Sequence, residues 1–160
     1  MAVDAAAFRQ ALGSFPTGVT VVTMLDQDGA LQGLTASAFS AVSLDPPLVL
    51  VCVGYNSRSY HGLVAARRYA IHILREDQVG IARAFARPGM ARGDVVPWSL
   101  NARGLPVLDD YLTLLECRLA EEHRGGDHAI LVGEVESISA PDEDARPLLY
   151  YRGRLQEAGQ

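Results

Sequence analysis

The sequence contains no lysine, and all 14 of its basic side chains are arginines. A lysine Schiff base, whether with pyridoxal phosphate or with a carbonyl substrate, is therefore excluded. A P-loop is excluded as well, because that motif places a lysine on the phosphates of a nucleotide. An anion bound by this chain must be held by arginine, by hydroxyl groups or by backbone N–H groups.

Net positive charge and long apolar runs are also missing. The formal net charge is −5 and the isoelectric point is near 5.3, whereas a nucleic-acid-binding protein carries a basic surface. The longest apolar run, residues 48–53 (LVLVCV), is far too short to cross a membrane. No charged and apolar signal segment opens the chain. We therefore expect neither a nucleic-acid partner nor a membrane association.

Cysteine and histidine are too few or too poorly spaced for several kinds of site. Cys52 and Cys117 lie in apolar runs, which predicts two buried, reduced and unreactive thiols and favours a cytoplasmic location. The four histidines stand at no metal-ligand spacing, so no metal site is expected, and His72 is assigned a structural role within a strand. No Gly-x-Ser-x-Gly motif supports a nucleophilic hydrolase.

The length of 160 residues and the ordinary balance of apolar and charged residues predict one globular domain over residues 1–160. Apolar and β-branched runs predict strands over residues 18–25, 48–54, 69–74, 111–122, 128–138 and 148–151, with further extended chain over 30–43. Helices are predicted over residues 4–15, 56–66 and 76–86. Strands in hairpin-like order predict a mainly β fold, a small barrel or sandwich with a few short helices, and not a Rossmann fold.

Four details of this prediction are open to a direct check. Residues 111–122 fit a strand, with a helix as the alternative. The strand over residues 48–54 is expected to be buried on both faces. Residues 87–105, interrupted by proline and glycine, are expected to form a long irregular segment. The tail from Gly153 is expected to fray.

Three short segments combine the residue types that bind small molecules. Residues 56–59 (NSRS) follow a buried strand and open a helix, so N–H groups, hydroxyls and a guanidinium are available to a phosphate. The alternative is that Ser57 only caps the helix and Arg58 faces solvent. Residues 33–40 (GLTASAFS) would let a flat ligand approach the backbone, or form an edge strand with a bulge. Residues 125–128 (GGDH) bring an Asp-His pair to the start of a strand, or form a self-capped hairpin turn.

The sequence resembles the short-chain flavin reductases, which are the reductase components of two-component flavin-dependent monooxygenases. The resemblance covers about residues 8–154. Its motifs are residues 15–19 (FPTGV), 33–39 (GLTASAF), 42–49 (VSLDPPLV), 57–59 (SRS), 126–128 (GDH), 133–135 (GEV) and 147–151 (PLLYY). It implies an FMN-binding split β-barrel, a homodimer, FMN or FAD as flavin, and NADH or NADPH as hydride donor.

The resemblance also implies a set of site residues. Thr35, Ala36 and Ser37 would follow the edge of the isoalloxazine ring, Ser43 and Leu44 would line the ring or its ribityl chain, and Ser57, Arg58 and Ser59 would hold the phosphate. The complete flavin set is Gly33, Thr35, Ala36, Ser37, Ser43, Leu44, Ser57, Arg58, Ser59, Phe85, Ala86 and Arg87. The nicotinamide nucleotide would be contacted by His128, Tyr150, Tyr151 and Arg152.

The function implied is hydride transfer from a nicotinamide nucleotide to flavin, with reduced flavin passing to a separate monooxygenase. This chemistry needs no catalytic acid or base, since the cofactors carry it. A 2′-phosphate of NADPH would find candidates in Arg87, Arg152 and Arg154. One alternative is a non-catalytic split-barrel module that binds flavin or heme as a sensor or carrier. A pyridoxamine-phosphate-oxidase-like enzyme ranks last, because few basic residues converge for a second phosphate.

Overall fold

A computed structural model of the chain describes residues 2–88, 92–141 and 144–157. Its elements, in chain order, are α1 (Ala5–Leu12), β1 (Thr17–Gly18), β2 (Thr20–Leu25), β3 (Leu31–Ala36), β4 (Phe39–Leu44), β5 (Pro47–Gly54), α2 (Arg58–Ala66), β6 (Arg68–Ile73), α3 (Val79–Ala86), the 3₁₀ turn η1 (Arg92–Asp94), β7 (Trp98–Leu100), β8 (Pro106–Leu108), β9 (Thr113–Gly125), β10 (His128–Ser139), β11 (Leu148–Tyr151) and β12 (Arg154–Glu157). The mainly β fold with short helices is confirmed.

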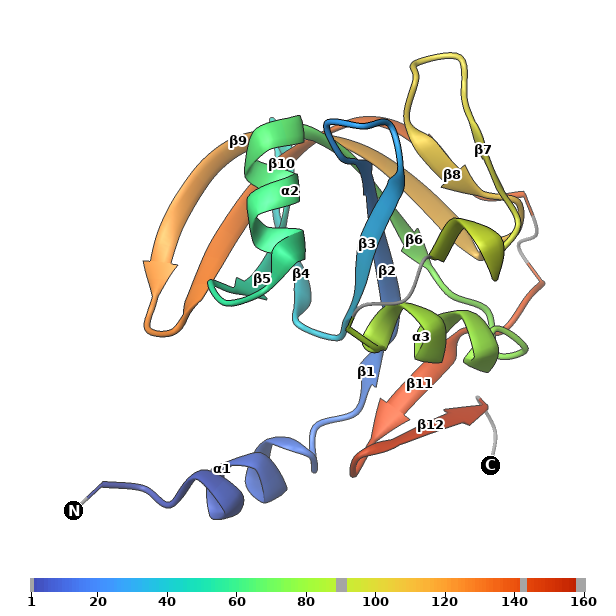
Figure 1. Cartoon of the computed structure of the whole chain (residues 1–160). Coiled ribbons are helices and arrows are strands. Elements are labelled where there is room, and N and C mark those ends of the chain that lie inside the picture. Colours follow the sequence, from blue (N-terminus) through green and yellow to red (C-terminus); the bar gives the residue numbers. More distant parts are fainter. Residues whose placement is uncertain (1, 89–91, 142–143, 158–160) are drawn as a thin grey trace.

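An antiparallel sheet in the order β3-β2-β6-β9-β10-β5-β4 forms the body of the molecule (Figure 1). The sheet curls, and its two edge strands β3 and β4 follow each other in the chain with only Ser37 and Ala38 between them. The edge strands are therefore close together at that end without being paired, as in a barrel that is split along one seam.

Two clusters of buried side chains hold this sheet together. One includes Val22, Ile71 and Leu131 on the strands and packs against Leu63 of α2. The other includes Val21 and Leu148 and packs against Phe85 of α3. Because adjacent residues of a strand point to opposite faces, β2 contributes to both clusters and is buried on both sides.

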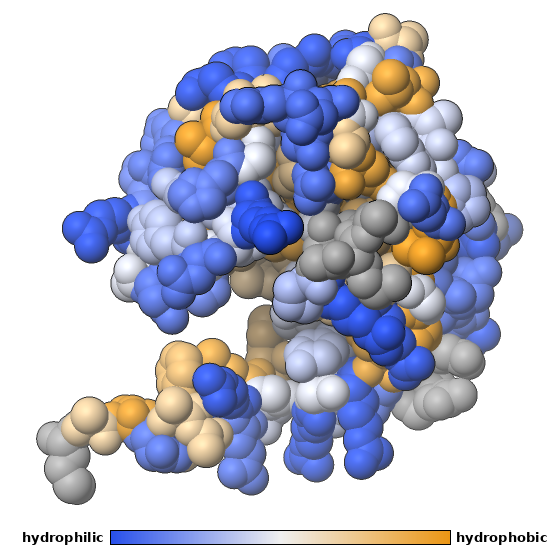
Figure 2. All heavy atoms as spheres, in the orientation of Figure 1, coloured by the Kyte–Doolittle hydropathy of each residue, from blue (hydrophilic) through white to orange (hydrophobic). Residues whose placement is uncertain are grey.

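The chain termini form a smaller three-stranded sheet, β1-β11-β12, which lies beside α1. The backbone N–H of Arg152 donates to Gly13 O at the end of α1 (2.9 Å). No residue of α1 is buried. Figure 2 shows the helix at the lower left, with apolar side chains beside a hollow that separates it from the body.

Several predicted details were wrong. β5 alternates between buried and half-buried residues, so within the described part of the chain only one of its faces is fully covered, whereas β2 is buried on both. The tail does not fray at once, since the chain reverses at Arg152 and Gly153 and β12 pairs with β11. The third helix begins at Val79 and not at Glu76. Cys52 is only half-buried, while Cys117 is buried as predicted.

The strand predicted over residues 111–122 is confirmed. It is β9, which runs over Thr113–Gly125, so the helical alternative is excluded.

The segment expected to be irregular contains a short hairpin, β7–β8, tied firmly to the sheet. Thr23 Oγ1 donates to Pro106 O (2.6 Å), and the Leu108 N–H donates to His72 Nε2 (3.1 Å). Asn101 accepts from the N–H groups of Arg103 and Leu105 and donates to Glu116 Oε1 (3.0 Å each). The local bonds of Asn101 shape the turn between β7 and β8, and the bonds to Thr23, His72 and Glu116 fasten the hairpin to the sheet.

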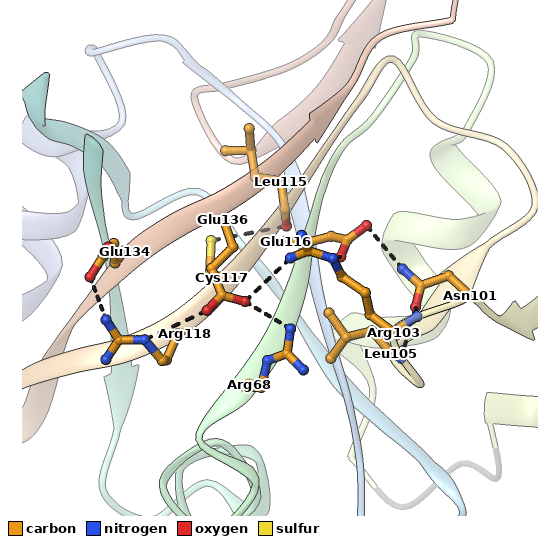
Figure 3. Close-up of polar contacts among 10 residues, drawn as sticks. All are labelled: Arg68, Asn101, Arg103, Leu105, Leu115, Glu116, Cys117, Arg118, Glu134 and Glu136. Carbon is orange, nitrogen blue, oxygen red and sulfur yellow. Dashed lines mark hydrogen bonds and ion pairs between the residues drawn. The ribbon is translucent and has the colours of Figure 1, made fainter. Parts of the chain in front are cut away.

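A network of ion pairs reinforces this attachment (Figure 3). Arg68, Arg103 and Arg118 converge on the carboxylate of Glu136, at 2.7, 3.4 and 3.6 Å. Arg103 also lies 3.6 Å from Glu116, and Arg118 also pairs with Glu134. Three of the 14 arginines are thus engaged with carboxylates of the sheet. Among the described residues, no helix is both long and apolar enough to cross a bilayer.

Candidate functional site

The outer edge of β3 offers backbone groups to a ligand. Among the residues that the structure describes, β3 is a terminal strand of the sheet and pairs only with β2. Ala36 O faces β2, where Thr20 Oγ1 donates to it (2.7 Å), whereas Gly33 O accepts a bond from α2. Since backbone groups alternate in direction along a strand, Gly33 and Thr35 present their N–H and C=O groups to the open edge. A planar ligand with acceptors along its rim can be read by such groups.

Helix α2 holds the open edge of β3 at one point. Ser59 is 6% exposed, and its Oγ donates to Gly33 O (3.1 Å). Helix α3 holds the same strand from the other side: Thr35 Oγ1 donates to Ala82 O (2.6 Å). In Figure 1, β3 runs between these two helices. The structure thus brings four of the predicted flavin residues close together, namely Gly33, Thr35, Ser59 and Phe85, and the contacts observed are between β3 and the two helices.

Gly33 has a packing reason to be glycine. A Cβ built at this position would overlap Val22 O and lie 2.9 Å from Phe85 Cε1. The Phe85 ring, which is buried, therefore rests directly on the backbone of β3. Through this contact Phe85 supports the strand that carries the predicted residues Gly33 and Thr35.

The start of α2 matches the predicted phosphate-binding segment. Ser57 is the N-cap, and its Oγ accepts from the Ser59 N–H (3.1 Å). Arg58, the first residue of the helix, is exposed. An N-cap hydroxyl that accepts a bond keeps its own hydrogen for a further acceptor, and the first N–H groups of a helix favour anions. Capping and anion binding are therefore compatible at this position.

The Asp127-His128 pair lies next to the connection from β5 to α2. His128 is paired with Gly54 in the register of β10 and β5, and the nearest atom to a Cβ built on Gly54 would be His128 Nε2, at 3.6 Å. Asp127 Oδ1 is 2.7 Å from His128 Nδ1, and Asp127 O accepts from the Tyr55 N–H (3.1 Å). The bond to His128 lowers the pKa of the Asp127 carboxyl. His128 thus lies beside Gly54, and Gly54 precedes the cap residue Ser57 by three positions in the chain.

Other predicted residues lie on other elements or at the exposed end of α3. Ser43 and Leu44 are on the edge strand β4, and Leu44 is 96% exposed. Ala86 and Arg87 are exposed at the end of α3. Tyr150, Tyr151 and Arg152 lie in the terminal sheet, where the Arg152 guanidinium stands 5.1 Å from the ring centre of Tyr151. Within the described part of one chain, the structure gives no contact between this group and His128.

Two residues beside the predicted site, Ala82 and Gly54, had no signal in the sequence. Ala82 O accepts the hydroxyl bond of Thr35, and Gly54 lies beside His128, whose ring is bonded by Asp127. The GDH motif was a usable signal for Asp127, because an Asp beside a His is well placed to bond its ring. The contacts of Ala82 and Gly54 depend on where the backbone lies, which leaves no signature in residue type.

Comparison with known proteins adds independent information. Residues 12–159 match the family model described as a flavin reductase-like domain. The chain is 44% identical over 135 residues to a probable flavin reductase of Rhizobium meliloti, covering 84% of this chain and 43% of that protein. It is 43% identical over 146 residues to the NADH-dependent FMN reductase SmoA of Agrobacterium fabrum, covering 91% of this chain and 82% of that protein. Thus the chain spans less than half of the first relative and most of the second.

Two further similarities concern a monooxygenase subunit and a solved structure. The chain is 37% identical over 152 residues to HsaB of Mycobacterium tuberculosis, the reductase subunit of a flavin-dependent monooxygenase, covering 94% of this chain and 81% of that protein. The structure superposes with a TM-score of 0.90 on the NADH:FAD oxidoreductase SgcE6 of Streptomyces globisporus, solved with NAD and FAD fragments, at 36% identity, covering 96% of this chain and 92% of that chain. The split-barrel architecture is therefore shared with flavin reductases.

Proposed function

Because the chain belongs to the flavin reductase-like family, we propose that it is an NAD(P)H:flavin oxidoreductase that reduces FMN or FAD. The observation that carries the proposal is the combination of an open strand edge on β3 with an arginine-bearing helix start on α2. A buried hydrogen bond between Ser59 of α2 and Gly33 of β3 joins the two. Reduced flavin then passes to a separate monooxygenase, as the name of its relative HsaB indicates for that protein.

The residues present fit a flavin without help from lysine. The N–H groups of Gly33 and Thr35 on the open edge of β3 suit the acceptor-rich rim of the isoalloxazine ring, and Ser37 directly follows the strand. The phosphate is held by the hydroxyl of Ser57 and the guanidinium of Arg58. Arginine suits this role because its planar donors match a phosphate and its charge does not titrate. The bound flavin supplies the chemistry, which is acceptance of a hydride from the nicotinamide ring.

The protein's part in this reaction is to orient the two ligands and exclude wrong geometries. His128 is held by Asp127 with its Nε2 beside Gly54, where it can contact the nicotinamide nucleotide. Hydride transfer does not require the imidazole of His128 or the carboxylate of Asp127 to exchange a proton with the substrate. Tyr150, Tyr151 and Arg152 complete the nucleotide site from the terminal sheet. A further contact to flavin comes from Ser43, Leu44, Ala86 and Arg87.

A homodimer brings together two groups that are separate within one chain, namely the residues around His128 and those of the terminal sheet. Phe8, Leu12 and Phe15 recur along α1 and its end, and each is more than half exposed. An isolated helix of this length is marginal in water, so it needs a covering surface. A second copy of the chain provides that surface, and the exposed side of β4 is a matching apolar region through Val42 and Leu44.

The test is a turnover assay with purified protein, NADH or NADPH, and FMN or FAD, followed at the absorbance band of the reduced nicotinamide. We expect flavin-dependent oxidation with at least one of the four pairs. If none of the pairs is turned over, the proposal is wrong. Tight retention of a flavin without turnover would indicate the non-catalytic binding module instead.

Substitution of His128 tests the nucleotide site. His128→Ala is expected to raise the KM for the nicotinamide nucleotide roughly tenfold and the KM for flavin much less, because a lost ligand contact of this kind is worth about 1.5 kcal/mol. The matched control is His123→Ala, which removes an exposed histidine from the neighbouring strand β9. Equal nucleotide KM values in the two variants would remove His128 from the site.

A further inference from the structure

The hydroxyl groups of Ser59 and Thr35 are both occupied by backbone carbonyls. Ser59 Oγ donates to Gly33 O at 3.1 Å, and Thr35 Oγ1 donates to Ala82 O at 2.6 Å. We propose that Ser59 and Thr35 are positioning residues that hold the flavin-binding edge of β3 between α2 and α3, and that Ser59 is not a ligand of the flavin phosphate. This inference rests on the proposed function and changes the part that the SRS motif plays in it.

The hydroxyl group of Ser59 has a single hydrogen, which it can give to one acceptor. Phosphate oxygens are acceptors and need donors, and a serine has one O–H to give. The O–H of Ser59 is given to Gly33 O in a buried environment. Breaking that bond would leave a buried carbonyl without a donor, which is unfavourable. Ser57 differs, because its Oγ accepts from the Ser59 N–H and its own hydrogen stays available.

The two bonds fix the strand from opposite directions. Ser59 attaches β3 to α2 at Gly33, and Thr35 attaches it to α3 two residues further on. Phe85 of α3 packs on Gly33, where there is no room for a side chain. The position of the edge N–H groups relative to the phosphate-binding start of α2 is therefore set by these contacts.

A phosphate ligand and a strand-positioning residue have different signatures with different flavins. A phosphate ligand contributes to FMN but not to riboflavin, which lacks the phosphate. A positioning residue contributes to both, because both carry the isoalloxazine ring. The ratio of kcat/KM for FMN to kcat/KM for riboflavin, here called the phosphate preference, therefore separates the two roles.

The experiment measures the phosphate preference of the full chain and of three variants, with the nicotinamide nucleotide held saturating. Ser59→Ala and Thr35→Val are each expected to lower kcat/KM about tenfold for FMN and for riboflavin alike, so that the preference stays within about twofold of the unmodified value. Arg58→Ala, the matched variant at the neighbouring position, is expected to lower the preference roughly ten- to hundredfold. Ser59→Thr keeps the hydroxyl and is expected to restore activity with both flavins.

Two results would show that Ser59 is not a positioning residue. A fall in phosphate preference for Ser59→Ala as large as that for Arg58→Ala would overturn the positioning role, and so would unchanged kcat/KM for both flavins. If thermal unfolding shows that Ser59→Ala does not fold, Thr35→Val decides by the same criterion. Failure of the unmodified chain to reduce either flavin would instead overturn the proposed function, and the positioning role with it.

Discussion

At the scale of single residues, His72 shows how burial determines ionisation. The imidazole is fully buried. Its Nε2 accepts from the Leu108 N–H, so Nδ1 carries the hydrogen and donates to Val21 O (3.0 Å). Burial lowers the pKa of His72 to about 4. The neutral ring is thus required for the bond that anchors the β7–β8 hairpin, and the predicted structural role of His72 is consistent with these contacts.

This depressed pKa predicts a loss of stability in mild acid. Above the ordinary histidine pKa of about 6.5 both states are neutral and the contribution is complete. As the pH falls from about 6.5 to 4, the unfolded chain takes up a proton that the folded chain does not. The free energy of unfolding should then drop by a total of about 3 kcal/mol. Urea unfolding at a series of pH values measures the slope.

A variant that cannot titrate separates this effect from that of the carboxyl groups. His72→Gln should lose the dependence between pH 5 and 6.5, where most carboxyl groups are still ionised. The same slope in the variant and in the unmodified chain would assign the acid sensitivity to other groups.

Gly133 illustrates a residue that is fixed by a neighbour distant in the sequence. A Cβ at this position would overlap the hydroxyl of Tyr69 and lie 3.2 Å from Cys117 Cβ. The Tyr69 hydroxyl is buried without a hydrogen-bond partner among the described residues, and burial raises its pKa well above the ordinary value. Close packing against Gly133 therefore takes precedence over satisfaction of this hydroxyl.

Gly133→Ala is expected to lower the free energy of unfolding by about 2 kcal/mol, because overpacking of a buried site costs energy of this order. In the Tyr69→Phe background the loss should be about half as large, since the hydroxyl that the methyl group meets is gone. Denaturant unfolding of the four proteins in this cycle gives the coupling energy. Additive effects would show that the methyl group is accommodated in another way.

At the scale of elements, the hairpin β11–β12 contains a turn whose sequence conflicts with its conformation. Arg152 and Gly153 both have positive φ, 47° and 75°. A two-residue turn with two such residues favours Asn-Gly, and a residue with a large side chain is strained at the first position. Strained residues often persist where they serve a ligand, which agrees with the proposed contact of Arg152 to the nucleotide.

Arg152→Asn is therefore expected to act in opposite directions on stability and on binding. The free energy of unfolding should rise by about 1 kcal/mol as the strain is relieved. The KM for the nicotinamide nucleotide should rise several-fold. Gly153→Ala is the matched control and should lower stability by about 1 kcal/mol, because alanine is strained at positive φ. An unaltered nucleotide KM in Arg152→Asn would limit Arg152 to its place in the turn.

Most helices and strands could be predicted from the sequence, because they depend on residues that are adjacent in the chain. The features that could not be predicted depend on distant segments. Ser57 could be recognised as a cap because capping depends on adjacent residues. The strand β12 could not, because it exists only by pairing with β11 after the turn at Arg152. β5 was predicted to be buried on both faces from its apolar sequence, yet the covering of a face is decided by other elements.

At the scale of the whole molecule, the exposed apolar residues of α1 predict an association between copies. Leu12→Asp is expected to convert a dimer to a monomer, because a carboxylate would have to be buried in an apolar contact. Multi-angle light scattering after size-exclusion chromatography measures the mass. Gln10→Asp places the same charge on the opposite side of the helix and should leave the dimer intact. A monomeric unmodified chain, or equal masses for both variants, would contradict the interface.

The sequence by itself determined the chemistry available to this protein. The absence of lysine restricts anion binding to arginine, hydroxyls and backbone groups, and the ordered motifs indicated the family and its cofactors. The tertiary structure decided how each group is used. Ser59 meets Gly33 across 26 positions of sequence, and Thr35 meets Ala82 across 47. A hydroxyl can give its one hydrogen to a single acceptor, and which acceptor lies within reach depends on packing between distant segments and not on residue type.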